Sequence, residues 1–328
     1  MKSKIILAGG AGFLGRMLQK HFAAKGWEVV VLSRRLVGAD GAVRFVRWDG
    51  EQIGEWSREL EGALALVNLA GRSVNFRYNA RNRRLIMDSR LNSTRVLGEA
   101  IAHCERPPKV WLNSSTATIY EHSVDESMGE WNGRIGASEE AKDAFSVEVA
   151  MAWEKSFAEC NTPRTRKVAL RTAMVLGVDA GGVYRVLRRL TRLGLGGAMG
   201  DGRQYVSWIH ADDFCRAIDW LITERETCGV VNLAAPDPLP NRKMMSTLRW
   251  VLGVPFGLPA AKWMLEIGAF LMRTETELII KSRRVVPRRL EQEGFRFRHR
   301  HFVEAVRALE QELADDVNQL RLETEVVA

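Results

Sequence analysis

The stretch Ala8-Gly9-Gly10-Ala11-Gly12-Phe13-Leu14-Gly15 stands between a short apolar run, Lys4–Ala8, and a segment with helical spacing, Gly15–Lys25. Its glycines form the pattern G-x-x-G-x-x-G in a strand–turn–helix context, which is far more specific than glycines alone. We expect Gly9 to permit a tight turn, Gly12 to let a phosphate approach the backbone, and Gly15 to let the helix pack on the strand. The helix N-terminus then favours a pyrophosphate at this turn. We therefore predict a dinucleotide site at Gly9, Gly12, Phe13, Leu14 and Gly15; a glycine-rich loop that arose by chance is the alternative.

The rest of the first half alternates strand-like and helix-like runs. Predicted strands cover residues 4–8, 28–32, 43–48, 65–69, 109–114 and 166–175, and predicted helices cover residues 15–25, 81–104 and 142–160. This alternation is typical of a parallel sheet with crossover helices. We therefore predict the α/β class, with a doubly wound parallel sheet of the Rossmann type.

A change of composition divides the chain after Pro236-Asp237-Pro238. Beyond it, prolines punctuate short helical segments and arginine is in excess. We predict a nucleotide-binding domain over residues 1–235 and a small, mainly helical domain over residues 236–328. An apolar stripe in the last helix (Val306, Leu309, Leu313 and Leu320) favours a packing face over a dimer seam, and a monomer or a homodimer is expected.

Composition excludes several classes of protein. The chain has 328 residues, of which 46% are hydrophobic and 27% charged, as in ordinary globular proteins. The longest apolar stretches, at 63–71 and 258–272, are too short or are broken by Lys262 and Glu266, so no membrane span is expected. The N-terminus lacks a secretory apolar run, which predicts a cytoplasmic protein. The four cysteines show no paired spacing, and no metal site is expected.

The formal net charge of +8 is unevenly distributed. The segment Lys281–His301 holds eight Lys or Arg residues against two glutamates. Such a patch attracts nucleic acid, anionic lipid or a phosphorylated ligand, or is simply a solvated surface. Because the chain has no aromatic RNA-binding motif or zinc finger, nucleic acid is not the favoured partner.

The end of the second predicted strand selects between the two nicotinamide dinucleotides. NAD-binding folds place an acid there for the ribose 2′-hydroxyl, whereas this chain has Ser33-Arg34-Arg35. A guanidinium pairs with a 2′-phosphate, and the serine adds a hydroxyl. The sequence therefore favours NADP(H) as cofactor, with a pair of ordinary loop arginines as the alternative.

Several motifs now point to one family. The glycine turn, Asn68-Leu69-Ala70-Gly71 and Ser114-Ser115-Thr116-Ala117-Thr118-Ile119-Tyr120 resemble the extended short-chain dehydrogenase/reductases. More narrowly, the chain resembles the atypical NAD-dependent epimerase/dehydratase family proteins that carry a C-terminal domain of unknown function. Further matching pieces are Asp88-Ser89-Arg90, Leu170-Arg171-Thr172, Leu193-Gly194-Leu195-Gly196-Gly197, Gly200-Asp201-Gly202-Arg203-Gln204 and Ser207-Trp208-Ile209-His210.

The resemblance implies a set of cofactor contacts. It implies that Ser33, Arg34, Leu69, Ala70 and Arg90 touch the cofactor. We predict the same contact for Gly71, Ser114 and Arg35, which stand in these motifs or beside them. Asp49 resembles the family's adenine-side acid, with a structural turn as an equal alternative. Arg203 and Gln204 resemble a substrate-side loop, in which Arg203 could grip a carboxylate or phosphate.

The expected catalytic pair is missing. Reductases of this type usually carry Tyr-x-x-x-Lys on one helix, where the lysine lowers the tyrosine pKa. Here, anchoring on Glu154 puts Ser146 and Ala150 at those two positions. Thr116 matches the residue that holds the substrate oxygen. Tyr120 and His210 are candidate proton carriers, and each has a structural role as its alternative.

Two classes of function follow from these motifs. The first is an NADP(H)-dependent epimerase or reductase acting on a small oxygenated, anionic substrate. The second is a regulator or interaction protein that senses NADP without turnover, and the missing dyad keeps it open.

Overall fold

The computed structural model describes residues 2–35, 41–74, 76–224, 226–261, 264 and 277–327, without the side chains of residues 278 and 319–327. Its strands are β1 (Lys4–Ala8), β2 (Glu28–Ser33), β3 (Val43–Arg47), β4 (Ala65–Asn68), β5 (Val110–Thr116), β6 (Arg166–Thr172), β7 (Met174–Leu176), β8 (Tyr205–Val206), β9 (Trp208–His210), β10 (Gly229–Leu233) and β11 (Leu239–Pro240). Its helices are α1 (Phe13–Ala24), α2 (Ala80–Ala102), α3 (Ala144–Glu159), α4 (Val183–Leu190), α5 (Ala211–Thr223), α6 (Asn241–Val251), α8 (Glu277–Ile280), α9 (Arg288–Gln292) and α10 (Phe302–Val327). Short helical turns are η1 (Glu55–Leu60), η2 (Ala117–Ile119) and η3 (Thr191–Leu195).

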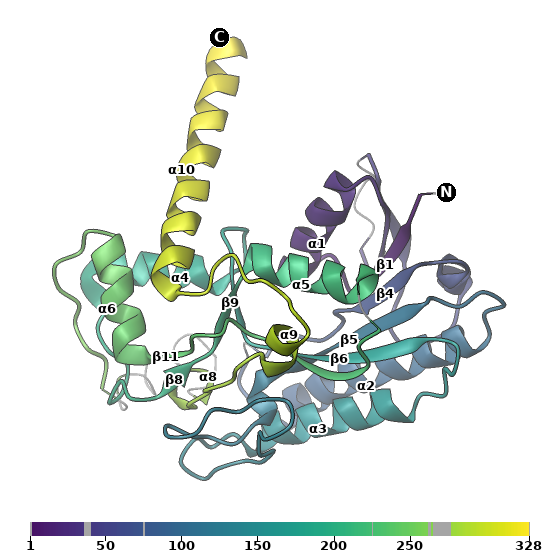
Figure 1. Cartoon of the computed structure of the whole chain (residues 1–328), viewed down its shortest axis with the longest axis horizontal. Coiled ribbons are helices and arrows are strands. Elements are labelled where there is room, and N and C mark those ends of the chain that lie inside the picture. Colours follow the sequence, from purple (N-terminus) through teal and green to yellow (C-terminus); the bar gives the residue numbers. More distant parts are fainter. Residues whose placement is uncertain are drawn as a thin grey trace.

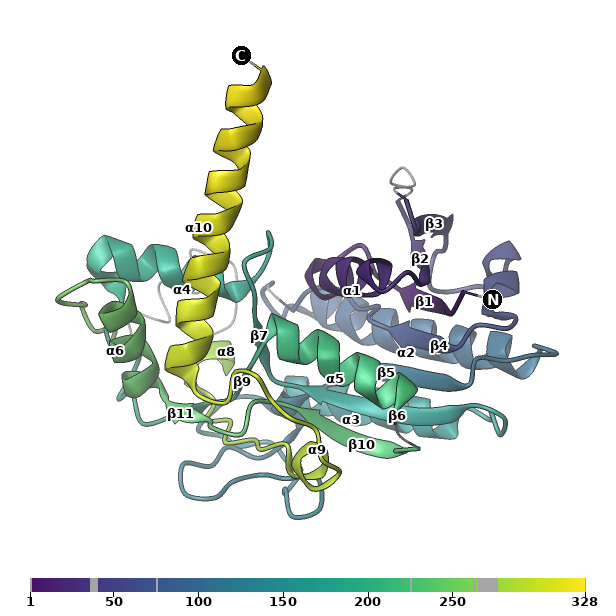
Figure 2. The same ribbon diagram turned by 45° about the horizontal axis from the view of Figure 1, so that its top comes forward.

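Seven parallel strands form the central sheet in the order β10-β6-β5-β4-β1-β2-β3. The chain winds outward from β1 in one direction and then from β4 in the other, so the switch point lies between these two strands. Helices α1 and α5 cover one face of the sheet and α2 and α3 cover the other (Figures 1 and 2). The predicted doubly wound, Rossmann-type fold is confirmed.

Both faces of the sheet are buried, which explains the continuous apolar runs of its strands. Alternate residues point to opposite faces: Ile5 and Leu7 pack with Leu18 and Phe22 of α1, whereas Ile6 packs on the α2 side. Side chains of β1, β2, β4 and β5 therefore fill two cores, one on each face of the sheet.

One predicted strand is divided in the structure. The run 166–175 was expected to be continuous, but β6 ends at Thr172 and β7 belongs to a separate two-stranded sheet with β9. The break falls at Ala173, whose N–H donates to the carbonyl of Leu233 in β10, while the next N–H, of Met174, donates to Ser207. The chain changes pairing partner here, which no local pattern in the sequence indicates.

Residues on both sides of the predicted boundary at 236 share a core. Tyr184 and Trp208 pack with Leu248 of α6 and with Phe302 and Leu309 of α10. The chain also returns to the main sheet, because Leu290, Phe295 and Phe297 join the core on the α5 side. The division of the chain at residue 236 stays a prediction.

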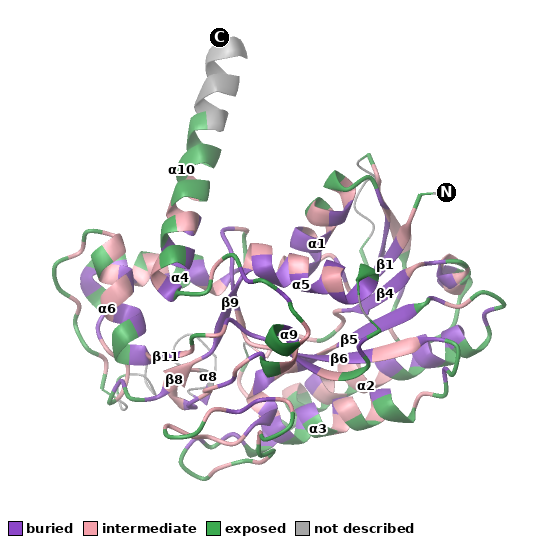
Figure 3. Ribbon diagram, in the orientation of Figure 1, coloured by how far each residue is buried: buried purple, intermediate pink, exposed green. Residues whose placement is uncertain are grey.

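Helix α10 rises from the body of the molecule, and most of its described length beyond the base is exposed (Figures 1 and 3). Val306 and Leu309 are buried at its base and Leu313 packs beside them, while the side chain of Leu320 lies outside the described residues. Among the described residues, no helix has the length and apolarity needed to cross a membrane. Most of the apolar stretch 258–272 lies outside that part of the chain.

The basic segment Lys281–His301 is largely paired within the fold. Lys281 forms a buried ion pair with Asp143, and Arg289 pairs with Glu293 at 2.9 Å. Nearer its end, Arg298 pairs with Asp212 at 3.2 Å and Arg300 with Glu291 at 2.8 Å. These ion pairs favour a structural role for the segment over a nucleic-acid surface.

Candidate active site

The glycine turn joins β1 to α1 through a very close approach of backbone segments. Gly9 has φ +71°, and a Cβ atom there would lie 2.7 Å from the Cα of Ala70. A Cβ atom on Gly15 would lie 1.9 Å from the carbonyl oxygen of Gly10. Around Gly12, in contrast, such an atom would meet nothing within 4 Å. Gly9 and Gly15 are therefore required by packing, and Gly12 borders open space at the N-terminus of a helix.

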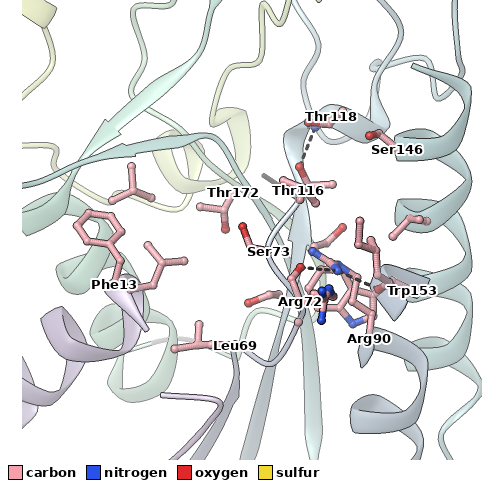
Figure 4. A pocket seen from close by; sticks show the side chains of 18 of the residues that line it. Phe13, Leu69, Arg72, Ser73, Arg90, Thr116, Thr118, Ser146, Trp153 and Thr172 are labelled. Carbon is pink, nitrogen blue, oxygen red and sulfur yellow. Dashed lines mark hydrogen bonds between the residues drawn. The ribbon is translucent and has the colours of Figure 1, made fainter. Parts of the chain in front are cut away.

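A cavity of about 550 Å³ opens beside this turn, at the carboxyl ends of β4, β5 and β6. Such an edge, next to a switch point, is where open α/β sheets bind ligands. Of the residues singled out in the sequence, seven line the cavity: Phe13, Leu14, Leu69, Gly71, Arg90, Ser114 and Thr116. Figure 4 shows Phe13 and Leu69 on one side of the space and Arg72, Arg90 and Trp153 on the other. Ala70 lies beneath Gly9 instead, as part of the turn.

Arg90 is a fixed cation in the cavity wall. Its guanidinium lies 5.1 Å from the ring centre of Trp153 and donates through Nη1 to the carbonyls of Ile86 and Arg72. Burial lowers the pKa of Arg90 to about 10, so the group stays charged at neutral pH. The neighbouring Arg72 also lines the cavity, and its Nε has no hydrogen-bond partner in the described part of the chain. This wall suits an anionic ligand.

A second hollow of about 680 Å³ lies at the ends of β2 and β3, lined by Arg34, Trp48 and Asp49 among others. Ser33 is buried, and its Oγ accepts the N–H of Arg35 at 3.2 Å. Asp49 Oδ1 accepts the N–H groups of residues 51 and 52, and these hydrogen bonds hold the pKa of Asp49 below its usual value. Asp49 thus borders the hollow and also closes a turn, so both the adenine-side acid and the structural turn stay possible roles of this residue.

The two proton-carrier candidates of the sequence do not reach the cavity. Tyr120 is 1% exposed, its hydroxyl donates to Asn232 Oδ1 at 2.9 Å, and burial raises the pKa of Tyr120. His210 is buried and caps α5, because its Nδ1 accepts the N–H of Asp212 at 3.1 Å. Burial, helped by the stacked ring of His299, lowers the pKa of His210 to about 3. These placements favour the structural alternative for both residues.

Arg203 and Gln204 also lie apart from this cavity. Gln204 is buried and its Nε2 donates to the carbonyl of Met199 at 2.8 Å. Arg203 is exposed and lines two other hollows, next to Val124 and Asp125. Neither residue lines the cavity beside the glycine turn, so their contact with substrate stays a prediction.

A group that the sequence analysis did not identify lies at the far end of the cavity from the glycine turn. Tyr78 and Ser146 line the space, and the hydroxyl of Tyr78 donates to Glu277 Oε1 at 3.2 Å and lies 3.4 Å from Ser146 Oγ. Ser146 also donates to Glu277 Oε1. Burial raises the pKa of Glu277. Of the three, the sequence analysis named only Ser146, as the residue at the position of the missing tyrosine, and it missed Tyr78 and Glu277.

Charged side chains support this group from behind. Lys281 and Asp143 form a fully buried ion pair, and Lys281 Nζ also donates to the carbonyl of Thr118 at 2.6 Å. Arg283 Nε donates to Thr118 Oγ1 at 3.2 Å. The segment 277–283 thus reaches from the C-terminal part of the chain to the loop after β5.

Comparisons with known proteins agree with this geometry. The model of the NAD dependent epimerase/dehydratase family matches residues 5–234, and that of a Domain of unknown function (DUF1731) matches residues 260–309. The Epimerase family protein YfhF of Bacillus subtilis is 28% identical over 294 residues, 89% of this chain and 93% of that protein. The human Epimerase family protein SDR39U1 is 28% identical over 297 residues, 90% of this chain and 95% of that protein.

Solved structures give the same result. The crystal structure of human SDR39U1 (isoform 2) with NADPH has a TM-score of 0.81 at 26% identity and covers 94% of this chain and 99% of that one. A nucleoside-diphosphate sugar epimerase from Corynebacterium glutamicum has a TM-score of 0.71 at 25% identity and covers 100% of this chain and 68% of that one. Since the family model spans well over half of the sequence, the chain belongs to the NAD dependent epimerase/dehydratase family.

Proposed function

We propose that this chain is an NADP(H)-dependent enzyme of the epimerase and reductase type, acting on a small, oxygenated, anionic substrate. The observation that carries the proposal is the open space at Gly12, at the N-terminus of α1, beside a cavity lined by seven residues of the family motifs. The human relative whose structure contains NADPH supports the choice of dinucleotide.

The residues present fit a 2′-phosphorylated dinucleotide. Gly12 leaves room for a pyrophosphate against the free N–H groups of the helix, where a negative charge is favoured. Arg34 lines the second hollow, at the end of β2, where the ribose 2′-phosphate of a doubly wound fold binds. NADPH supplies, when bound, a hydride from its nicotinamide ring.

The other end of the cavity handles the substrate oxygen and charge. Thr116 Oγ1 accepts the N–H of Thr118 at 3.1 Å, and its own O–H can donate to an oxygen of the substrate. Arg90 keeps the cofactor contact expected from the sequence, and the cation of Arg72, in the same cavity wall, favours a carboxylate or phosphate on the substrate. Thr116 therefore orients the substrate oxygen, and Arg72 holds its anionic part.

Calorimetry with both dinucleotides tests the proposal. NADPH is expected to bind at least tenfold tighter than NADH, or about 1.4 kcal/mol. Arg34→Ala should remove most of that preference, and Gly12→Val should abolish binding of both, since a branched side chain fills the space for the pyrophosphate. Arg203→Ala is the matched control, because Arg203 is an exposed arginine in a different hollow. Equal affinities for NADPH and NADH would refute the cofactor assignment.

The missing dyad favours a second candidate function, an NADP sensor without turnover. A single measurement distinguishes the two functions: whether carbonyl compounds oxidise bound NADPH. Tight NADPH binding with no oxidation by any carbonyl compound supports the sensor.

A further inference from the structure

One carboxylate oxygen at the end of the cavity joins three distant parts of the chain. Tyr78, which precedes α2, and Ser146, in α3, both donate to Oε1 of Glu277, in α8. The two hydroxyl groups line the cavity, while Glu277 lies behind them and is 5% exposed. Figure 4 shows Ser146 next to Thr116 and Thr118, at the end of the cavity away from Phe13 and Leu69. The hydroxyl groups of Tyr78 and Ser146 thus connect the buried carboxyl of Glu277 to the cavity.

The position of Ser146 relates this arrangement to proton transfer. Ser146 stands where related reductases carry the proton-donating tyrosine, and Ala150, where they carry the lysine, is fully buried in an apolar core. The hydroxyl of Tyr78 lies 3.4 Å from Ser146 Oγ and therefore reaches the same region from another element. The lysine Lys281 lies behind this end of the cavity, with its ammonium on Asp143 and on the carbonyl of Thr118.

We propose that Tyr78 is the proton carrier for the substrate oxygen in this cavity, and that Glu277, hydrogen-bonded to Tyr78 and Ser146, is its proton store. The inference rests on the proposed function, because a reduced nicotinamide dinucleotide must supply the hydride. It assigns to the C-terminal segment 277–283 a direct part in catalysis.

The step balances in atoms and electrons. As the carbonyl carbon of the substrate gains a hydride, the electron pair of the C=O π bond moves to oxygen. For the transfer, the Tyr78 O–H turns from Glu277 Oε1 to the substrate oxygen and gives it the proton. The Tyr78 oxygen then takes the proton of the protonated Glu277 carboxyl, and the Glu277 carboxylate takes a proton from the solvent. Thr116 and Ser146 donate or accept hydrogen bonds throughout and change no bond of their own.

The surroundings of Glu277 determine how firmly it holds a proton. Burial raises the pKa of Glu277, and the negative charge of Asp143 acts in the same direction. Hydrogen bonds from Ser146 and Tyr78 and the positive charge of Arg283 oppose the rise, and Lys281 is a further cation nearby. The carboxyl therefore keeps its proton to a higher pH than an exposed glutamate, as a proton store requires.

The chain contains a matched control for this pair. The hydroxyl of Tyr184 donates to Glu310 Oε1 at 2.7 Å, and neither residue lines the cavity. Tyr184→Phe and Glu310→Gln therefore remove the same chemical groups at a distance from the cavity.

The first test measures NADPH oxidation with a panel of small carbonyl compounds that carry a carboxylate, such as 2-oxo acids. Tyr78→Phe keeps the edge-to-face contact with Phe145, at 4.9 Å between ring centres, and should lower kcat by about 10²–10⁴-fold, with NADPH affinity within about threefold of wild type. Wild-type kcat should fall as pH rises through the pKa of Glu277, and Glu277→Gln should lose that fall. Tyr184→Phe should behave as wild type. Full activity of Tyr78→Phe would overturn the proposal.

The second test needs no substrate. Infrared titration should reveal a protonated carboxyl band that is missing from Glu277→Gln, is kept by Glu310→Gln, and has a midpoint above the ordinary glutamate value of about 4.3. A midpoint at or below that value would overturn the role of Glu277 while leaving NADPH binding, and hence the proposed function, intact. Failure to bind NADPH in calorimetry would instead refute the proposed function. NADPH binding without oxidation by any carbonyl compound of the panel would overturn both catalytic roles.

Discussion

Two tyrosine–glutamate pairs in this molecule have the same chemistry and opposite surroundings. In each, a tyrosine hydroxyl donates to a glutamate that lies far along the chain: Tyr78 to Glu277 at 3.2 Å and Tyr184 to Glu310 at 2.7 Å. Glu310 also accepts hydrogen bonds from the guanidinium of Arg188, at 2.6 and 3.1 Å. The hydrogen bonds that Glu277 accepts from described residues come from hydroxyl groups.

The difference in donors shifts the pKa values of the two carboxyls in opposite directions. Burial favours the protonated form of both, but at Glu310 the hydrogen bonds from Arg188 and Tyr184 outweigh it and hold the pKa below its usual value. At Glu277 burial prevails and the pKa is raised. The pair near the arginine is therefore an ionic clamp that fixes α10 to α4, whereas the pair at the cavity is suited to hold and release a proton.

Removing the cation behind each pair should give the largest contrast. Lys281 and Asp143 are fully buried, so Lys281→Met leaves a buried charge without its partner and should cost about 3–5 kcal/mol of unfolding free energy. Arg188 and Glu310 keep access to water, and Arg188→Met should cost about 1 kcal/mol. Urea unfolding measures both values. Adding Asp143→Asn to Lys281→Met should recover part of the loss; losses of equal size in the two single variants would contradict the comparison.

Neutralising the two glutamates should give a smaller contrast. Glu310→Gln removes a charge-assisted bond to Arg188 and should cost about 1.5–3 kcal/mol at neutral pH. Glu277→Gln removes a carboxyl whose pKa is raised by burial and keeps an amide oxygen that can accept from Ser146 and Tyr78, so it should cost less than about 1 kcal/mol. The same unfolding experiment decides the order. A greater loss for Glu277→Gln would mean that Glu277 is held as an anion and stores no proton.

Much of the fold follows from local sequence. Strands buried on both faces are continuous apolar runs, so the predicted range 4–8 matches β1 and the predicted range 28–32 differs from β2 by one residue. The glycine turn is local at Gly15, which closely approaches Gly10 of the same turn, whereas Gly9 approaches the distant Ala70 and Gly12 borders open space. The division of β6 from β7 could not be foreseen, because it depends on which distant strand takes the next hydrogen bond.

The candidate site also has a part that the sequence predicts and a part that it does not. The cofactor motifs around Leu69 and Arg90 are short and can be recognised in the sequence. The structure brings them to one cavity, and their contact with a cofactor stays a prediction. Tyr120 follows Thr116 closely in the sequence, as expected of a residue on the same loop. The helical turn η2 between them directs the Tyr120 side chain into the core. Tyr78 and Glu277 are 199 residues apart, and no spacing rule connects them.

The smallest expected effect is a difference of sign in pH dependence. Because the folded pKa of Glu277 is raised, the stabilisation that its proton contributes is complete below the unfolded pKa of about 4.3 and is lost as pH rises through the folded value. Because the folded pKa of Glu310 is lowered, its contribution is present above about 4.3 and is lost as pH falls through the folded value. The penalty of Glu277→Gln should therefore shrink as pH rises above about 4.3, while that of Glu310→Gln should grow as pH rises toward about 4.3 from below and stay level above it. Unfolding by urea at several pH values, with wild type measured in parallel, gives both trends. Penalties that change with pH in the same direction would show that the two pairs do not differ in proton affinity, and the distinction between clamp and proton store would fail.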